Sequence, residues 1–109
     1  MNEIIKGYTD EFIERIKTSD EYIAYKNKVN VIQRIPDLMN QINEYRDENF
    51  RLQNTYEGDE LFDKTEELQN RYDNLLNDSN ATLFLHAEAD FVKMLQEINY
   101  QILEGLDFQ

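Results

Sequence analysis

The chain has no cysteine, no tryptophan, one histidine, one proline and three glycines. Without cysteine it can form no disulfide, no thiolate nucleophile and no thiolate metal site. Isolated glycines cannot form the glycine-rich loop that cradles phosphate groups. Several common kinds of enzyme and cofactor site are therefore excluded by composition.

Basic residues are also scarce. The chain has 11 Lys and Arg against 23 Asp and Glu, which gives a formal net charge of −12 at pH 7. This charge repels the phosphate backbone of nucleic acids and the headgroups of anionic lipids. We therefore expect no direct binding to nucleic acid.

Long apolar runs are missing as well. No stretch approaches the roughly 20 apolar residues that a membrane-spanning helix needs. The opening residues, "MNEIIKGYTDEF", lack the apolar segment of a secretory signal peptide. We therefore predict a cytoplasmic protein without membrane insertion.

What the sequence does contain is a helical pattern over one domain, residues 1–109. Apolar residues recur at spacings of three and four, not two, which favours helices over strands. The 12% aromatic content distinguishes the chain from a disordered acidic tail. We predict an all-α fold of four to five helices, with a central long antiparallel helical hairpin, that packs as an oligomeric helical bundle.

The first two helices are predicted from their apolar spacing and their capping residues. Thr9 is a candidate N-cap of the first helix, and "TSDE" reads as a capping box in which Thr18 caps the second helix and Glu21 reaches back. Pro36 ends or kinks this helix, because proline has no amide hydrogen. The apolar side of the second helix contains Tyr22, Tyr25, Val29 and Ile32.

The middle of the chain predicts a helical hairpin. Apolar positions alternate at spacings of four and three, break at the glycine turn "YEGDE", and then resume. The series is Leu38, Ile42, Tyr45, Asn49, Leu52 and Tyr56, followed by Leu61, Thr65, Leu68, Tyr72 and Leu75. The polar residues Asn49 and Thr65 either fix the register and the choice of partner or simply lie near a solvent-exposed end of the hairpin.

A last helix is predicted in "ATLFLHAEADFVKMLQEINYQILEGL", with Gly105 as its C-cap. Its apolar stripe contains Phe84, Ala87, Phe91, Met94, Leu95, Ile98 and Ile102. His86 and Asp90 share a face beside this stripe, whereas Glu88 points elsewhere. The segment therefore offers at most two converging ligands.

No catalytic or metal-binding motif is present. The helix lacks the Glu-x-x-His pairs of di-iron bundles, and "HAEAD" does not match the HExxH motif of zinc proteases. The only serines, Ser19 and Ser79, fall in a predicted cap and a predicted turn. We predict no enzymatic activity, no metal and no cofactor.

Two segments, "IERIKTSDEYIAYKN" (13–27) and "HAEADFVKMLQEINYQI" (86–102), resemble the YlbF/YmcA family of small bacterial helical proteins. "SDEYIAYK" is similar to the family pattern Ser-Glu-Glu-Tyr-x-x-Tyr-Lys, and "AEADFVKMLQEIN" to Ala-Glu-x-Glu-Leu-x-x-Leu-Leu-Gln-Glu-Ile-Asn. His86 stands where the family usually has Glu. The likeness spans nearly the whole chain.

The resemblance implies an all-α, self-associating protein without enzymatic activity. Family members in Firmicutes regulate competence, sporulation and biofilm development, and some form a complex that modulates messenger-RNA processing by RNase Y. Some of these members hold iron–sulfur clusters through cysteines, which this chain lacks. The chain is therefore expected to be a paralogue closer to the YheA-like branch, and not a functional equivalent of these members.

The expected partners are a second copy in a homodimer or higher oligomer, sister family proteins and RNase Y. A hairpin standing alone buries too little apolar surface to offset its conformational entropy, so it must pack on other helices. A regulatory scaffold is the leading interpretation; the alternatives are a structural self-assembling protein, an acidic mimic of nucleic acid and an unusual carboxylate enzyme. The predicted core and interface residues are Tyr22, Tyr25, Leu38, Ile42, Tyr45, Asn49, Leu52, Leu61, Leu68, Tyr72, Phe84, Phe91, Leu95, Ile98 and Ile102.

Overall fold

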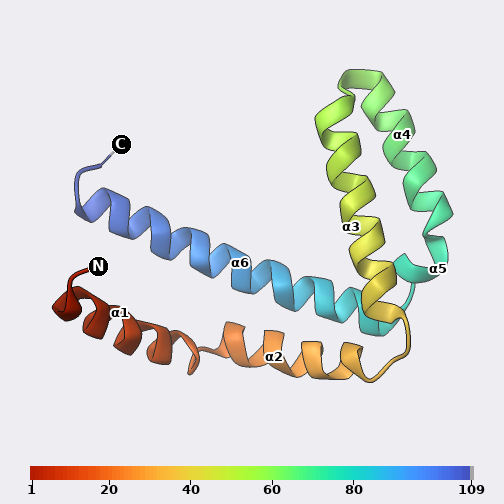
Figure 1. Cartoon of the computed structure of the whole chain (residues 1–109). Coiled ribbons are helices and arrows are strands. Elements are labelled where there is room, and N and C mark those ends of the chain that lie inside the picture. Colours follow the sequence, from red (N-terminus) through yellow and green to blue (C-terminus); the bar gives the residue numbers. More distant parts are fainter. Residues whose placement is uncertain (109) are drawn as a thin grey trace.

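The computed structural model describes residues 1–108, which form six α-helices and no strand (Figure 1). The all-α prediction is confirmed, with one or two more helices than expected. The helices are α1 (Glu3–Ile16), α2 (Asp20–Gln33), α3 (Leu38–Thr55), α4 (Gly58–Arg71), α5 (Asp73–Leu76) and α6 (Ser79–Gly105). None of these helices combines the length and apolar character that a membrane crossing requires.

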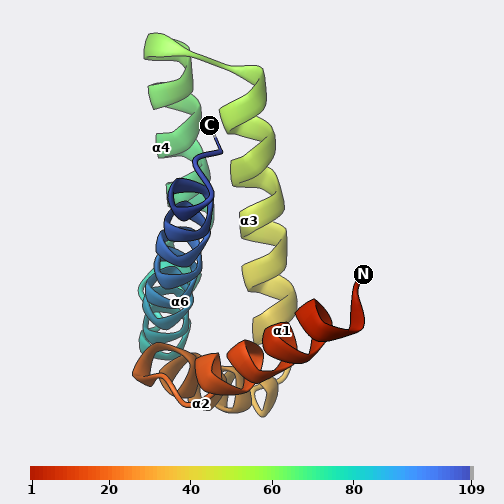
Figure 2. The ribbon, with the colours of Figure 1, turned by 90° about the vertical axis from the view of Figure 1, so that its left-hand side faces the viewer.

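The helices form two arms that meet at an angle. Figures 1 and 2 show α2 beside α6 in one arm and the antiparallel pair α3 and α4 in the other, with α1 leading into the first arm at its far end. The radius of gyration is 17.9 Å, whereas a compact domain of this length has about 13 Å. The chain is therefore elongated, with principal extents of 50 × 37 × 21 Å.

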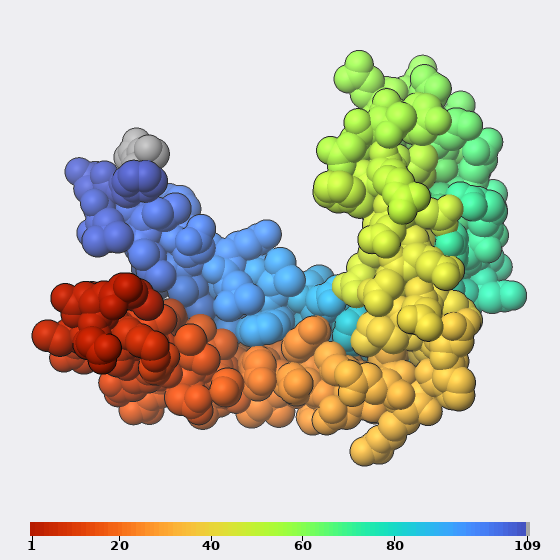
Figure 3. All heavy atoms as spheres, in the orientation of Figure 1, coloured from red at the N-terminus to blue at the C-terminus, as the bar shows by residue number. Residues whose placement is uncertain are grey.

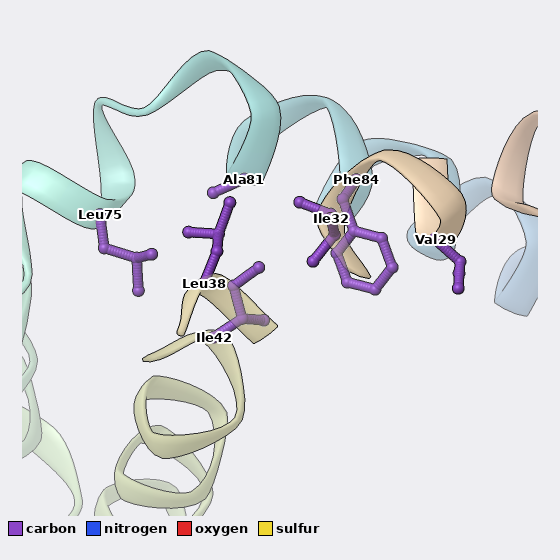
Figure 4. Packing of buried hydrophobic residues seen from close by; sticks show 7 residues of the cluster. All are labelled: Val29, Ile32, Leu38, Ile42, Leu75, Ala81 and Phe84. Carbon is purple, nitrogen blue, oxygen red and sulfur yellow. The ribbon is translucent and has the colours of Figure 1, made fainter. Parts of the chain in front are cut away.

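A small hydrophobic core holds the corner between the two arms, and we call it the elbow core (Figure 4). It draws side chains from α2, α3, α5 and α6. Its members are Val29, Ile32, Leu38, Ile42, Leu75, Ala81 and Phe84. Leu68 is also fully buried, in α4 and outside this cluster.

The corner itself is made by Pro36 and Asp37. Helix α2 ends at Gln33, and α3 begins at Leu38, as the position of the proline predicts. Asp37 has a left-handed backbone (φ 68°), which redirects the chain, and its carboxylate accepts a hydrogen bond of 3.2 Å from the Gln41 side chain. This reversal carries Leu38 and Ile42 into the elbow core.

The caps of the first two helices differ from the prediction. Asn2 caps α1 by accepting from the Ile4 amide at 2.8 Å, whereas the Thr9 hydroxyl lies inside the helix and donates to the Ile5 carbonyl oxygen. Ser19 caps α2 by accepting from the Tyr22 amide at 3.1 Å. Thr9 was therefore wrong as a cap, and the predicted capping box is displaced by one residue because Thr18 and Ser19 are both good cap formers.

The end of α6 also differs. Gly105 is the last helical residue, and the C-cap is Leu106. The left-handed residue that reverses the chain is Asp107 (φ 56°), and the Phe108 amide donates to the Leu103 carbonyl oxygen at 2.9 Å. The prediction of Gly105 as the cap is wrong by one residue, since an aspartate here tolerates the left-handed conformation.

The predicted hairpin is present, but its second helix is shorter than expected. Its turn contains Gly58 with a φ of 62°, a conformation that glycine adopts without steric cost. The predicted series ran without interruption to Leu75, whereas α4 ends at Arg71 and the backbone breaks at Tyr72. This break lets the short helix α5 direct Leu75 into the elbow core.

Candidate interaction surfaces

Helices α2 and α6 are joined by a row of aromatic rings. The Tyr25 ring lies 6.0 Å from the Phe84 ring and 5.3 Å from the Phe91 ring, between centroids. The Tyr22 ring meets Phe91 edge-on at 5.5 Å. Aromatic pairs at these separations stabilise packing beyond their buried area. The two segments that carry the family resemblance thus pack directly on each other.

Arg46 fixes the second arm to the first. Its guanidinium forms an ion pair with Glu88, donates to Asn43 Oδ1 at 2.7 Å, and lies 5.9 Å from the centre of the Phe84 ring. The Arg46 and Glu88 side chains are 37% and 24% exposed, so solvent only partly screens the pair. The side of α3 that carries Arg46 therefore faces α6.

The only histidine does not lie in a ligand cluster. His86 and Asp90 are exposed on α6, while the nearby Glu88 is occupied by Arg46. Over residues 1–108, no three His, Cys, Asp or Glu side chains come close enough to hold a metal ion. His86 and Asp90 thus lie on a solvent-facing strip of α6, and Glu88 is a structural carboxylate that pairs with Arg46.

A polar cluster links the two helices of the hairpin on one face. The Tyr72 hydroxyl donates a hydrogen bond to Glu48, and Arg71 Nη1 donates to the same carboxylate at 3.2 Å. The bond from Tyr72, followed by the charge of Arg71, holds the pKa of Glu48 below its usual value despite some burial. The same bond raises the pKa of Tyr72.

The residues predicted as core or interface fall into three groups of exposure. Leu38, Ile42, Leu68 and Phe84 are buried. The half-buried ones are Tyr22, Tyr25, Tyr45, Asn49, Leu52, Leu61, Tyr72, Phe91 and Ile98. Leu95 and Ile102 are exposed. Thr65, the other polar residue of the hairpin series, is half-buried like Asn49.

The structure divides the predicted apolar stripe of α6 into two faces. Phe91 packs on the tyrosines of α2, and Met94 and Ile98 are half-buried along the same side. Leu95 and Ile102 instead lie on a second face, with 39% and 48% of their surface exposed. Sequence spacing missed this division, because residues one position apart can both be apolar and still face different neighbours.

Helix α1 packs only loosely on the far end of α6. It has no buried residue, although Ile4, Ile5, Tyr8, Phe12 and Ile13 are all apolar or aromatic. An open groove of about 480 Å³ lies between the two helices. The groove is lined by Phe12, Ile98, Gln101, Ile102, Gly105 and Leu106.

The chain exposes more surface than a compact protein of its size. Its accessible surface is 8602 Å², whereas a compact monomer of this mass has about 6,400 Å². Much of the excess is apolar, since Phe50 and Phe62 on the hairpin are 70% and 69% exposed. Exposed apolar patches of this extent are typical of protein-interaction surfaces.

Comparison with protein families gives one match that covers almost the entire chain. The model described as "Control of competence regulator ComK, YlbF/YmcA" matches residues 5–107. Searches of curated proteins and of solved structures find no match. The matched range includes all of α2 to α6 and most of α1.

Proposed function

The chain belongs to the YlbF/YmcA family, which controls the competence regulator ComK, and we propose that it is a non-enzymatic, cytoplasmic regulatory scaffold that binds other proteins. A regulator of this kind needs surface that a partner can cover. The apolar surface left open along α6 and the hairpin is the observation that carries the proposal.

In its finer form, the proposal is that the protein modulates RNase Y-dependent processing of messenger RNA, and through it competence, sporulation and biofilm development. The resemblance of α2 and α6 to the family segments supports this role. A second copy, sister family proteins and RNase Y are the proposed partners. Because the chain has no cysteine, it would act without the iron–sulfur clusters of some family members.

Two other functions make different predictions. A purely structural oligomer would bind only itself. An acidic mimic of nucleic acid would lose its basic partner steeply as salt rises, because that binding depends on charge. The acids that cap and open helices, such as Asp20, Asp59 and Asp78, are dispersed over the molecule instead of forming a phosphate-like row.

The test is a tagged pull-down at physiological and at high salt, from a lysate of the organism that encodes the protein. The proposal predicts that RNase Y or sister family proteins are recovered in fixed stoichiometry and retained at high salt, since apolar contacts resist screening. Leu95→Asp should lose these proteins, whereas Ile23→Asp, on exposed surface of α2, should retain them. Recovery of the bait alone would contradict the regulatory role.

A further inference from the structure

The inner face of the hairpin, toward α6, carries two exposed phenylalanines. Phe50 lies one helical turn beyond Arg46 and so shares the side of α3 that faces α6. Phe62 follows the seam residue Leu61 just as Phe50 follows Asn49, and equal offsets in an antiparallel pair place both side chains on one face. The Glu48–Arg71 ion pair, formed by residues that each precede a seam residue, marks the opposite face.

Helix α6 and its C-cap residue present a regular series of uncharged, mostly apolar residues on the side that faces Arg46 through Glu88. Starting from Glu88, the series advances by four, three, four, three and four residues, the spacing of a coiled-coil seam. We call Val92, Leu95, Asn99, Ile102 and Leu106 the exposed seam. All five are exposed, and Leu106 retains 72% of its surface.

Charge is absent from this seam although it is plentiful elsewhere on α6. The charged residues after Glu88 lie on the opposite side of the helix, according to the helical period. They are Asp90, Lys93, Glu97 and Glu104. On α3, the inner side beyond Arg46 is likewise uncharged, with Phe50 and Gln53. On α4, however, Glu66 lies one helical turn beyond Phe62. The uncharged surfaces of the angle are therefore the exposed seam of α6 and the inner side of α3, in a chain of net charge −12.

The angle between these walls is open, as the space-filling view shows (Figure 3). The chain exposes about 2,200 Å² more than a compact monomer of its mass. Burying about half of this excess on each of two subunits would total about 2,200 Å², which falls within the range of obligate homodimers. A basic partner would favour the acidic outer surfaces, whereas the uncharged seam of α6 and inner side of α3 suit a second acidic copy of the same chain.

We infer that the angle seats a second copy of this chain in a two-fold dimer, with the exposed seams of the two α6 helices packed antiparallel. This inference rests on the proposed self-association and adds its surface and register. The seam runs from Val92 to Leu106, so its midpoint, Asn99, lies at the two-fold axis. Leu95 then packs on the partner's Ile102.

The same dimer geometry explains why the inner face of the hairpin carries two phenylalanines that are exposed on the chain alone. With Asn99 at the axis, the base of the hairpin at Glu88 lies beside the C-terminal end of the partner's α6. Phe50 and Phe62 cover that end, where Leu106 is exposed on the chain alone. A polar residue at the centre of an apolar seam costs stability but fixes its register.

The absence of cysteine allows a direct test of the register. In the full chain, Asn99→Cys places a single thiol at the axis, where two copies can form a disulfide. Glu97→Cys, two residues away on the charged side, is the control. Under mild oxidation we expect at least a tenfold higher yield of covalent dimer from Asn99→Cys on a non-reducing gel, and equal or negligible yields would overturn the inference.

Light scattering separates this inference from the broader proposal. Leu95→Asp should shift the mass from dimer to monomer with unchanged helical circular dichroism, whereas Ile23→Asp on the side of α2 away from α6 should remain dimeric. A wild-type dimer that shows no seam-specific cross-linking would refute the register and leave self-association standing. A wild-type monomer at micromolar concentration would refute both.

Discussion

The two halves of α6 carry similar apolar side chains in very different surroundings. In the N-terminal half, Ala81, Phe84 and Ala87 are buried in or beside the elbow. In the C-terminal half, Leu95 and Ile102 are exposed, as is the C-cap residue Leu106. Periodicity thus indicates which residues share a face, but it does not say whether the same chain or another molecule covers that face.

The largest expected difference comes from removing one phenyl ring near each end of α6: Phe84 in the elbow core, and Phe12 of α1, which lines the groove at the C-terminal end. Phe84→Ala should lower the free energy of unfolding by about 3–5 kcal/mol, because it opens a cavity in the elbow core. Phe12→Ala at the far end should cost less than about 1 kcal/mol, because that ring is 44% exposed. Urea denaturation followed by circular dichroism measures both, and similar losses would show that the far end is packed as firmly as the elbow.

A smaller effect is expected at the joint between the arms. Arg46→Ala should destabilise the fold by about 1–3 kcal/mol, because it leaves the half-buried Glu88 unpaired and removes the cation from the Phe84 ring. Small-angle scattering should also report a less uniform angle between the arms. Arg51→Ala on the same helix is the control, and an equal loss from both would argue against a specific joint.

The smallest effect concerns the hairpin and depends on pH. Tyr72→Phe removes the hydrogen bond to Glu48 and should cost about 1 kcal/mol at neutral pH. Because folding lowers the pKa of Glu48, this stabilisation is present above the unfolded pKa and is lost as pH falls through the folded pKa. Denaturation midpoints of the two proteins should therefore converge in acid; a constant difference down to the lowest pH would contradict the coupling.

At alkaline pH the same hydrogen-bonded pair depends on pH in the opposite direction, because its stabilisation is lost as pH rises. Folding raises the pKa of Tyr72, so its contribution is fully present below the ordinary tyrosine pKa and is lost as pH rises through the raised folded value. Spectrophotometric titration of tyrosine absorbance should detect one late-ionising group in the wild type. That late component should be absent in Tyr72→Phe.

The hairpin was predictable because its signals are local. Alternating spacings and a glycine at position 58 specify two neighbouring helices without reference to the rest of the chain. The ion pair of Arg46 with Glu88 could not be predicted in this way, since 42 residues separate its partners. The break at Tyr72 was missed for the same reason, because it accompanies the burial of Leu75 in a core built from helices distant in the sequence.

The candidate surface was only partly predictable. Leu95 and Ile102 were assigned to an interface or core from spacing, but the phenylalanines at 50 and 62 fit no apolar stripe within one helix. Their common face becomes apparent only once the two helices are paired. The role of such exposed residues can be inferred from how the helices pair, but not from the periodicity of a single helix.

The elbow has a consequence for the order of folding. Its core joins Ile32 to Phe84, and the whole hairpin lies between them in the chain. Closing so long a flexible loop is entropically costly, but a hairpin formed beforehand from local contacts brings its two ends together. We therefore expect α3 and α4 to pair early and the docking of α2 on α6 to complete folding. The preformed hairpin then holds α2 and α6, the two core helices farthest apart in the sequence, close enough to pack.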